Sequence, residues 1–185
     1  MDKKRIKVPP AELAKRARAV KLVAMDVDGV LTGGEIVILR SGEEIKFFNS
    51  KDRLCLAVMR DTKVPVKTAW ITGRSSEAVL EAARDLGVTE VVQKCRNKRE
   101  ALERILERHK LTFDDAAFIG DDLIDLSVLH AVRFSACPSD ATGDVLRRVH
   151  YVSPFAGGKG VVRDVLEFIL KAQGRWDDLV DSFLS

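Results

Sequence analysis

Short apolar runs alternate with longer segments of helical periodicity along most of this chain. The runs are apolar on both faces, as expected of buried strands, and they lie at 22–26, 65–71, 91–92, 116–119, 134–136 and 151–152. The helical segments lie at 10–18, 52–61, 75–86, 97–109, 123–130 and 161–172, and Ser75 or Ser76 is expected to cap the third of them. Strands that alternate with helices favour an α/β fold, a parallel sheet covered by helices on both faces in three layers.

One segment interrupts this alternation. Residues 35–40 and 43–48 have the pattern of two short strands joined by a Ser41-Gly42 turn, which predicts a protruding β-hairpin over about 33–48. Two-stranded hairpins rarely stand alone, so we interpret it as a flap in preference to a free surface ribbon. No internal repeat, linker or low-complexity tract is visible, so we expect a single domain over 1–185, with a tail from about 174 to 185.

Composition excludes several functions. The chain has 185 residues, of which 46% are hydrophobic and 32% charged, a balance typical of a globular domain. The net charge of +3 is small and evenly spread, so we expect no nucleic acid partner. No apolar segment is long enough to span a bilayer, so we expect no membrane association. The basic start is expected to be a solvated terminus and not a signal peptide; its residues are Lys3, Lys4, Arg5 and Lys7.

The cysteines and histidines form no recognisable site. The three cysteines are odd in number and lack metal-ligand spacing, which favours reduced thiols and a cytoplasmic protein; they are Cys55, Cys95 and Cys137. The three histidines lie in no motif with them and are expected at surfaces or helix ends; they are His109, His130 and His150. Cysteine nucleophile chemistry is therefore not expected.

Two carboxylates one residue apart end the first apolar run. Asp26 and Asp28 are followed by Gly29. Acids at the end of a buried strand are costly unless a cation lies nearby. The carboxyl end of a parallel strand is also where α/β proteins place their ligands. The pattern indicates a metal-assisted site with a carboxylate nucleophile, and an ordinary Asp-Gly turn is the alternative.

Similar polar residues follow three more strands, which a turn alone does not explain. They are Thr72-Gly73, Lys98 and Gly120-Asp121-Asp122-x-x-Asp125. Asp26 and Asp121 offer oxygen ligands that suit Mg²⁺. Thr72 offers a hydroxyl, Gly73 a backbone N–H, and Lys98 a point charge for a phosphate group. The sequence therefore predicts a magnesium-dependent phosphate site at the carboxyl edge of the sheet.

These motifs together resemble, in order and spacing from Asp26 to Asp125, the four motifs of the haloacid dehalogenase superfamily of phosphohydrolases. The resemblance implies a Rossmann-like three-layer fold and the following roles. Asp26 attacks phosphorus and forms an aspartyl-phosphate. Asp28 protonates the leaving alcohol and then activates water. The remaining roles are metal ligation by Asp26, the Asp28 backbone carbonyl and Asp121, support of the metal shell by Asp122 and Asp125, and binding of phosphate or substrate by Thr72, Gly73, Arg74 and Lys98.

The spacing of the motifs leaves no room for a cap domain. Only the 33–48 hairpin and a short stretch between Thr72 and Lys98 lie where many relatives insert one. This layout, with Gly157-Gly-Lys-Gly, resembles the 3-deoxy-D-manno-octulosonate 8-phosphate phosphatases over about 21–174; a flexible loop is the other interpretation of the glycines. That family implies a cytoplasmic homotetramer in lipopolysaccharide precursor synthesis, assembled by hairpins, with the site closed by a neighbour's surface and C-terminal tail. In that tail, helical spacing favours docking on a neighbour and disorder is the alternative; the residues are Trp176, Leu179 and Phe183.

The substrate is less well determined than the chemistry. Arg74 is similar to the arginine of the octulosonate phosphatases, where the nonulosonate 9-phosphate phosphatases have glutamate, and it suits a sugar-acid carboxylate; a solvated surface arginine is the alternative. The sequence departs from the family pattern at 51–55, Ala82 and Lys94. In the first of these segments, Lys51 and Asp52 either reach a substrate across a subunit boundary or form a surface ion pair.

Three alternatives therefore stay open. The first is the same chemistry on another phosphorylated sugar acid or a small phosphomonoester. The second is a phosphoacceptor signalling domain, which Asp28 disfavours because a switch needs no acid to hydrolyse its own phosphate. The third is a non-catalytic regulatory partner, which the complete set of motif acids disfavours.

Overall fold

The computed structural model describes residues 8–184. The expectations for the basic start and for the signal peptide concern residues 1–7 and lie outside the described residues. Within residues 8–184, no helix combines the length and the apolar character that crossing a bilayer requires.

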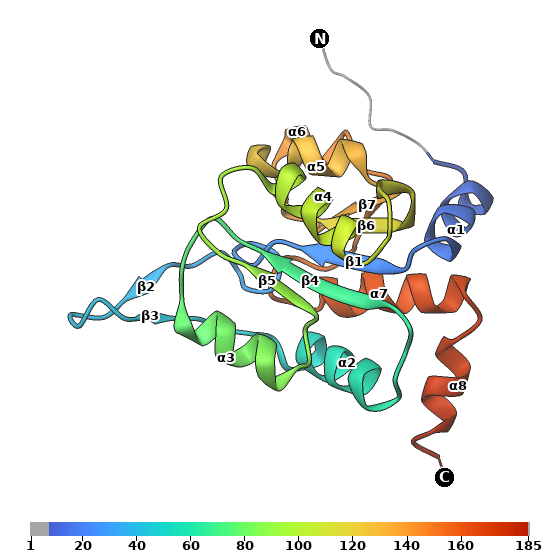
Figure 1. Cartoon of the computed structure of the whole chain (residues 1–185), viewed down its shortest axis with the longest axis horizontal. Coiled ribbons are helices and arrows are strands. Elements are labelled where there is room, and N and C mark those ends of the chain that lie inside the picture. The colour runs from blue at the N-terminus through green and yellow to red at the C-terminus, as the bar shows by residue number, and fades with distance from the viewer. Residues whose placement is uncertain (1–7, 185) are drawn as a thin grey trace.

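The predicted parallel sheet is confirmed. It has six strands in the order β5-β4-β1-β6-β7-β8, and every pairing is parallel (Figure 1). The strands are β1 (Leu22–Met25), β4 (Lys67–Ile71), β5 (Glu90–Val92), β6 (Ala116–Ile119), β7 (Phe134–Cys137) and β8 (Tyr151–Val152). The chain starts in the middle of the sheet, moves to one edge, and returns past β1 to build the other half.

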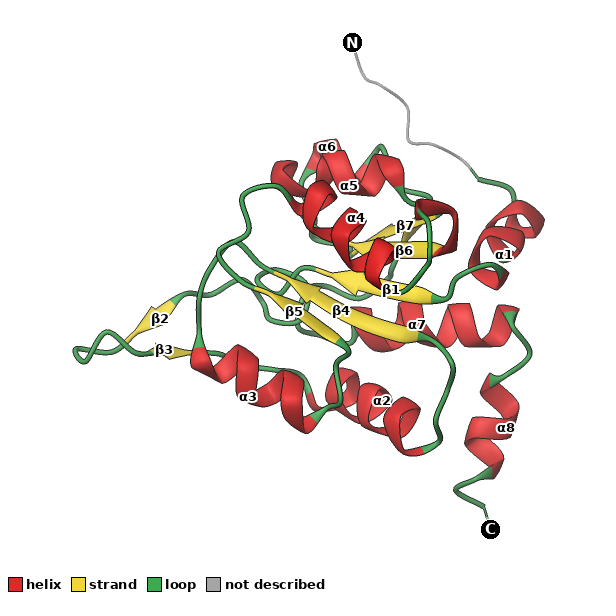
Figure 2. Cartoon of the chain, in the orientation of Figure 1, coloured by secondary structure: helices red, strands yellow, loops and turns green. Residues whose placement is uncertain are grey.

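Helices cover both faces of the sheet (Figures 1 and 2). One core lies under α1 (Pro10–Arg18), α2 (Ser50–Asp61), α3 (Glu77–Asp85), α7 (Val161–Ala172) and α8 (Trp176–Asp181). The other lies under α4 (Lys98–Arg108), α5 (Leu126–Ala131) and α6 (Gly143–Leu146). The described residues also form two short 3₁₀ helices, η1 (Phe113–Asp115) before β6 and η2 (Leu123–Asp125) before α5.

The apolar pattern of β1 explains why both faces must be covered. All four residues of this strand are buried. Val23 and Met25 point into the core under α7, whereas Leu22 and Ala24 point into the core under α4. Side chains alternate across a strand, so an uninterrupted apolar run is stable only between two helical layers. The sequence therefore fixes β1 as a central strand.

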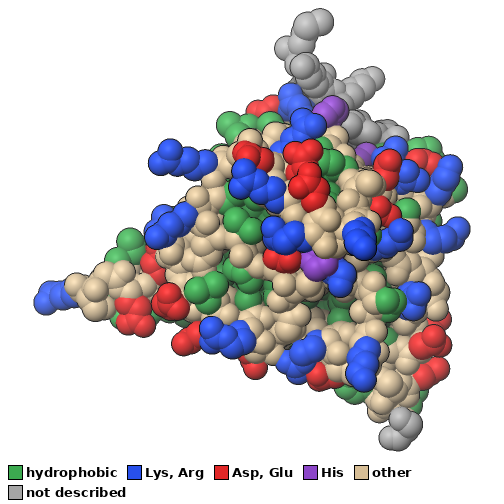
Figure 3. All heavy atoms as spheres, in the orientation of Figure 1, with side chains coloured by type: hydrophobic (Ala, Val, Ile, Leu, Met, Phe, Trp, Pro, Cys, Tyr) green, Lys and Arg blue, Asp and Glu red, His purple; other side chains and the backbone are tan. Residues whose placement is uncertain are grey.

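The predicted hairpin forms but its ladder is short. β2 (Val37–Ile38) pairs antiparallel with β3 (Glu44–Ile45), and Gly42 adopts φ +85° in the turn. The hairpin projects from the body of the molecule, on a face where positive and negative side chains are interspersed (Figures 1 and 3). Several apolar side chains on this segment are exposed; they belong to Ile36, Val37, Ile38, Leu39, Ile45 and Phe47.

Two sequence expectations need correction. Ser76 is the N-cap residue of α3, but its side chain makes no capping hydrogen bond. The Gln93 side chain instead accepts from the Ser76 backbone N–H at 2.8 Å and donates to the Ser76 carbonyl at 2.8 Å. In the C-terminal tail, Trp176 and Leu179 lie in the core of their own subunit, so the interpretation that they dock on a neighbour is wrong for these two residues. Phe183 is exposed.

Candidate active site

The register of the central strands brings the sequence motifs to one edge. Met25 pairs with Trp70 of β4 on one side and with Ile119 of β6 on the other. The ladder continues one residue further, because the Asp26 backbone N–H donates to the Ile119 carbonyl at 3.0 Å. Parallel strands end at the same side of a sheet, so the residues that follow them converge. Thr72 follows β4 directly in this way.

Lys98 is the charged centre of the site. Its Nζ lies 2.8 Å from Oδ2 of Asp26 and 2.7 Å from Oδ1 of Asp125, and all three side chains are buried. Asn97 caps α4 by accepting from the Glu100 backbone N–H at 3.2 Å, which fixes the first turn that carries Lys98. The two carboxylates fix the ammonium in one position, from which it can donate to a phosphoryl oxygen once a bound cation offsets the negative charge of the acids.

Three carboxylates lie within reach of one cation. In the part of the chain that the structure describes, ligand oxygens of Asp26, Asp121 and Asp125 lie within 4.8 Å of one another. Oδ2 of Asp125 already accepts from the backbone N–H groups of Asp121 at 3.0 Å and Asp122 at 3.3 Å. Asp125 therefore orients the loop and Lys98, and Oδ1 of Asp26 likewise accepts from the Val27 backbone N–H at 2.7 Å.

The protonation behaviour of these acids indicates that a cation belongs between them. Burial raises the pKa of Asp26 to about 6, although Lys98 acts in the opposite direction. Burial and the charge of Asp26 raise the pKa of Asp121 to about 7. A bound divalent ion removes this cost by neutralising both groups. An all-oxygen donor set of carboxylates suits a hard cation such as Mg²⁺.

Glycines allow the loops of the site to approach one another. Gly29 has φ +89°, and a Cβ atom there would lie 2.1 Å from Oδ2 of Asp121. A Cβ on Gly157 would lie 2.1 Å from the carbonyl oxygen of Gly29. The Gly158 backbone N–H donates to the Val30 carbonyl at 2.9 Å. The glycine segment thus packs on the loop that carries Asp26 and Asp28, and is more than a flexible connection.

Thr72, Gly73 and Arg74 leave β4 beside this cluster. Thr72 is buried, and its backbone N–H donates to the Val92 carbonyl at 2.9 Å. Its Oγ1 accepts from the Arg74 backbone N–H at 3.2 Å, which folds the turn back toward the strand end. The turn is held further by the Cys95 backbone N–H, which donates to the Thr72 carbonyl at 3.0 Å.

The hairpin contributes two residues that the sequence interpretation missed. Glu44 accepts from Nε of Arg74 at 3.1 Å and also pairs with its Nη2. Lys46 pairs with Glu44 at 3.2 Å and with Asp28. The signal was available in principle, because residues 44 and 46 are two positions apart and therefore share one face of an extended segment. What the pattern does not specify is the direction in which the hairpin leans.

Three other residues that the sequence analysis singled out have structural positions outside the carboxylate cluster. Asp122 is exposed and its Oδ1 accepts from the Leu123 backbone N–H at 2.7 Å, so it shapes the η2 turn. Lys94, one of the departures from the family pattern, adopts φ +54°, a conformation that glycine tolerates best. Ala82 is buried in the core and points away from solvent.

Asp52 corrects the expectations for the 51–55 segment. Its side chain is buried and accepts from the backbone N–H groups of Gly160 at 3.2 Å and Arg163 at 2.7 Å. It therefore caps the start of α7, and is neither a surface ion pair nor a substrate ligand. The remaining residues of the segment lie in the first turns of α2, where Arg53 pairs with Asp85 at 2.6 Å.

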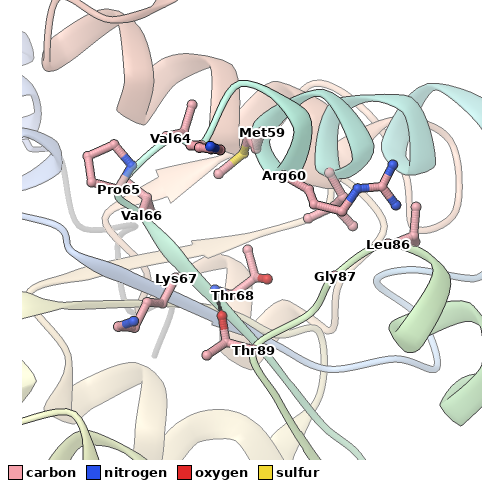
Figure 4. A pocket seen from close by; sticks show the side chains of 12 residues that line it. Met59, Arg60, Val64, Pro65, Val66, Lys67, Thr68, Leu86, Gly87 and Thr89 are labelled. Atoms are coloured by element: carbon pink, nitrogen blue, oxygen red, sulfur yellow. Dashed lines mark hydrogen bonds between the residues drawn. The ribbon is translucent and has the colours of Figure 1, made fainter.

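A separate cavity of about 380 Å³ lies at the other end of β4, between α2 and the end of α3 (Figure 4). Apolar side chains such as Met59 and Val64 line it, with Arg60 at the rim. The Arg60 guanidinium is engaged by Asp61 at 2.7 Å and by the Asp85 carbonyl. This cavity holds none of the acids of the cluster, so the chemistry belongs to the opposite edge of the sheet.

Comparison with known proteins agrees with this geometry. The family model of haloacid dehalogenase-like hydrolases matches residues 82–165. The 3-deoxy-D-manno-octulosonate 8-phosphate phosphatase KdsC of Escherichia coli K12 is 36% identical over 168 residues, which cover 91% of this chain and 88% of that protein. The corresponding KdsC of Yersinia pestis is 35% identical over 164 residues, or 89% of this chain and 87% of that protein.

Solved structures give the same result. The octulosonate phosphatase of Moraxella catarrhalis, in complex with magnesium ion, phosphate ion and a KDO molecule, superposes with a TM-score of 0.90 at 34% identity, covering 95% of this chain and 99% of that one. A cobalt-bound phosphatase of this kind from Haemophilus influenzae has a TM-score of 0.85 at 32% identity, covering 92% and 99%. The chain belongs to the haloacid dehalogenase-like hydrolases, and its capless relatives are octulosonate 8-phosphate phosphatases. It is a phosphatase, a hydrolase of phosphoric monoesters.

Proposed function

We propose that this protein hydrolyses 3-deoxy-D-manno-octulosonate 8-phosphate in a magnesium-dependent reaction, through an aspartyl-phosphate at Asp26. The observation that carries the proposal is the contact between Lys98 and Asp26 beside the Asp121 carboxylate. A nucleophile, a cation for the phosphoryl oxygens and acids for a metal thus meet at one strand edge. The choice of substrate is inferred from the relatives named above, which are octulosonate 8-phosphate phosphatases.

The residues of the chain divide the chemistry as follows. An oxygen of Asp26 bonds to phosphorus while the bond from phosphorus to the sugar oxygen breaks, and Asp28 gives that oxygen its proton. Asp28 then takes a proton from water, whose oxygen attacks phosphorus and releases phosphate and the Asp26 carboxylate. Lys98 and Thr72 stabilise the equatorial oxygens. Asp26, Asp121 and the Asp28 carbonyl are the proposed metal ligands, and Mg²⁺ supplies positive charge there.

Arg74 supports a carboxylate-bearing substrate. In this structure its guanidinium binds the carboxylate of Glu44, the same chemical group that a sugar acid presents. The nonulosonate 9-phosphates and simpler phosphomonoesters are the competing substrates. A conservative control, Arg74→Lys, keeps the charge and removes the planar pair of donors, so we expect it to raise KM for sugar-acid phosphates more than for a neutral sugar phosphate.

Phosphate release from a panel of sugar phosphates tests this proposal. We expect the octulosonate 8-phosphate to have the highest kcat/KM, and we expect chelator to abolish release and added Mg²⁺ to restore it. Equal rates in chelator would refute the metal dependence. A higher kcat/KM for a nonulosonate 9-phosphate or a neutral sugar phosphate would reassign the substrate and leave the chemistry intact.

The lifetime of the phosphoenzyme distinguishes a phosphatase from a phosphoacceptor signalling domain. A phosphatase turns over many times, whereas a receiver domain stops after one phosphoryl transfer. We expect Asp28→Ala to abolish turnover, because an alanine side chain can neither give nor take the proton. If Asp28→Ala hydrolysed its substrate at the wild-type rate, the acid/base role would be wrong.

We further infer a cytoplasmic homotetramer in lipopolysaccharide precursor synthesis, with a neighbour's surface closing the site. The exposed apolar side chains of the hairpin support assembly, since water contact with them is unfavourable; Ile38 and Phe47 are 59% and 64% exposed. Sedimentation velocity tests it: we expect a tetramer, and we expect Ile38→Asp to dissociate it. A monomeric wild-type protein would contradict this inference.

A further inference from the structure

The hairpin brings a buried lysine onto the proposed acid/base residue of its own chain. Lys46 pairs with the Asp28 carboxylate, and the side chains are 1% and 19% exposed. Within residues 8–184 its other partner is Glu44, at 3.2 Å. An ammonium removed from water to this degree is strongly unfavourable without both carboxylates. The contact is therefore a built part of the site.

Glu44 connects this lysine to the substrate-facing side. Its Oε1 accepts from Nε of Arg74, so Glu44 is held in place by Arg74 as well as by Lys46. Its Oε2 is buried and lies 3.2 Å from the Lys46 ammonium, so the same carboxylate holds both cations. Charges thus alternate along Asp28, Lys46, Glu44 and Arg74.

We propose that Lys46 is a positioning residue for Asp28, held in place by the Glu44–Arg74 pair, so that the hairpin works in the active site of its own subunit. The proposal rests on the phosphatase mechanism given above. A carboxylate that gives a proton to one oxygen and takes a proton from water must keep one orientation through both steps. Lys46 supplies that orientation.

Substrates with different leaving groups distinguish a positioning role of Lys46 from a general loss of active-site structure. An alkyl phosphate needs a proton on its leaving oxygen, whereas p-nitrophenolate leaves without one. We expect Lys46→Met to lower kcat for an alkyl phosphate about 10- to 100-fold, as the partial loss of general acid catalysis predicts. The burst of p-nitrophenol from p-nitrophenyl phosphate should stay within about threefold of wild type, because that step does not use the acid. Lys46→Arg should recover part of the alkyl phosphate rate.

Two further variants complete the test. Lys21→Met removes a lysine from an Asp115 pair of 2.8 Å at the opposite end of β1 and should leave both rates unchanged. Adding Lys46→Met to Asp28→Asn should cost little beyond Asp28→Asn alone, since the two residues act as a unit. Equal loss of the burst and of alkyl turnover in both Lys46 variants, or full retention of both, would overturn the positioning role. Absence of turnover in the wild-type protein would instead contradict the proposed function.

Discussion

The Nζ atom of Lys98 lies 2.8 Å from Oδ2 of Asp26, and both side chains are buried at the carboxyl edge of the central strands. The same ammonium lies 2.7 Å from Asp125. This relationship joins the proposed nucleophile of the first motif to the lysine of the third across more than seventy residues of chain. When one partner of such a buried pair is removed, the other is left as an uncompensated charge in the protein interior, and the folded state is destabilised.

Replacement of Lys98 should therefore affect both stability and rate. We expect Lys98→Met to lower kcat by about 100-fold or more, because a positioned donor to the phosphoryl oxygens is lost. The metal-free protein should also lose about 3–5 kcal/mol of unfolding free energy, since two buried carboxylates lose their partner. Kinetics and urea denaturation measure both, with Lys21→Met as the surface control. A kcat within about twofold of wild type would contradict the assignment.

Removal of Asp121 should stabilise the metal-free protein at high pH. Its folded pKa of about 7 lies above the ordinary aspartate value of 3.8, so the charged form costs free energy in the native state. That cost is full above pH 7 and disappears as the pH falls toward 3.8. We expect Asp121→Asn to gain about 1–2 kcal/mol at pH 8, after allowance for solvent screening, and to lose magnesium-dependent turnover. The same gain at pH 4, or in the exposed control Asp114→Asn, would be inconsistent with this explanation.

His150 makes stability depend on pH in the opposite direction. Its Nδ1 accepts from the Ser135 backbone N–H at 3.0 Å, and burial lowers its pKa from 6.5 to about 4. The unfolded chain binds the proton more readily, so this contribution is complete above pH 6.5 and is lost as the pH falls toward 4. The stability difference between wild type and His150→Gln should shrink by about 1–3 kcal/mol across that range. The control is the exposed His130→Gln; a pH-independent difference for His150 would refute the prediction.

Asp52 should contribute to stability without taking part in the chemistry. Asp52→Ala leaves the backbone N–H groups of Gly160 and Arg163 without their carboxylate at the start of α7, at a cost of about 1–3 kcal/mol. Asp52→Asn keeps one acceptor oxygen and should recover part of the loss. Thermal denaturation measures both, and the neighbouring Lys51→Ala serves as control. A stability of Asp52→Ala equal to wild type would show that the cap is unimportant.

The sequence predicts the central sheet and its family well because the evidence is local. Three of the four motifs follow directly on a buried strand, so the positions of Asp26, Thr72 and Asp121 at one edge follow from strand direction alone. The comparisons confirm the superfamily and the capless subfamily. The roles of the individual residues stay predictions that the experiments above address.

The residues that sequence reasoning missed depend on contacts between distant elements. Glu44 and Lys46 act through the direction in which the hairpin leans, which no local pattern specifies. Asp52 looks like a surface charge near a helix start until α2 packs beside the beginning of α7. At Ser76 the expected capping hydroxyl is replaced by the side chain of Gln93, which comes from beyond β5. In each case tertiary packing overrides a local preference.

The central claim is that Asp26 carries the phosphoryl group between two half-reactions. Rapid acid quench of the Asp28→Asn variant with ³²P-labelled p-nitrophenyl phosphate and Mg²⁺ tests it most directly, because the first step proceeds and the second is slowed. We predict close to one label per chain, released by neutral hydroxylamine, located on Asp26, and absent when Asp26→Asn is added. Label on any other residue, or wild-type turnover by Asp26→Asn alone, would contradict the account.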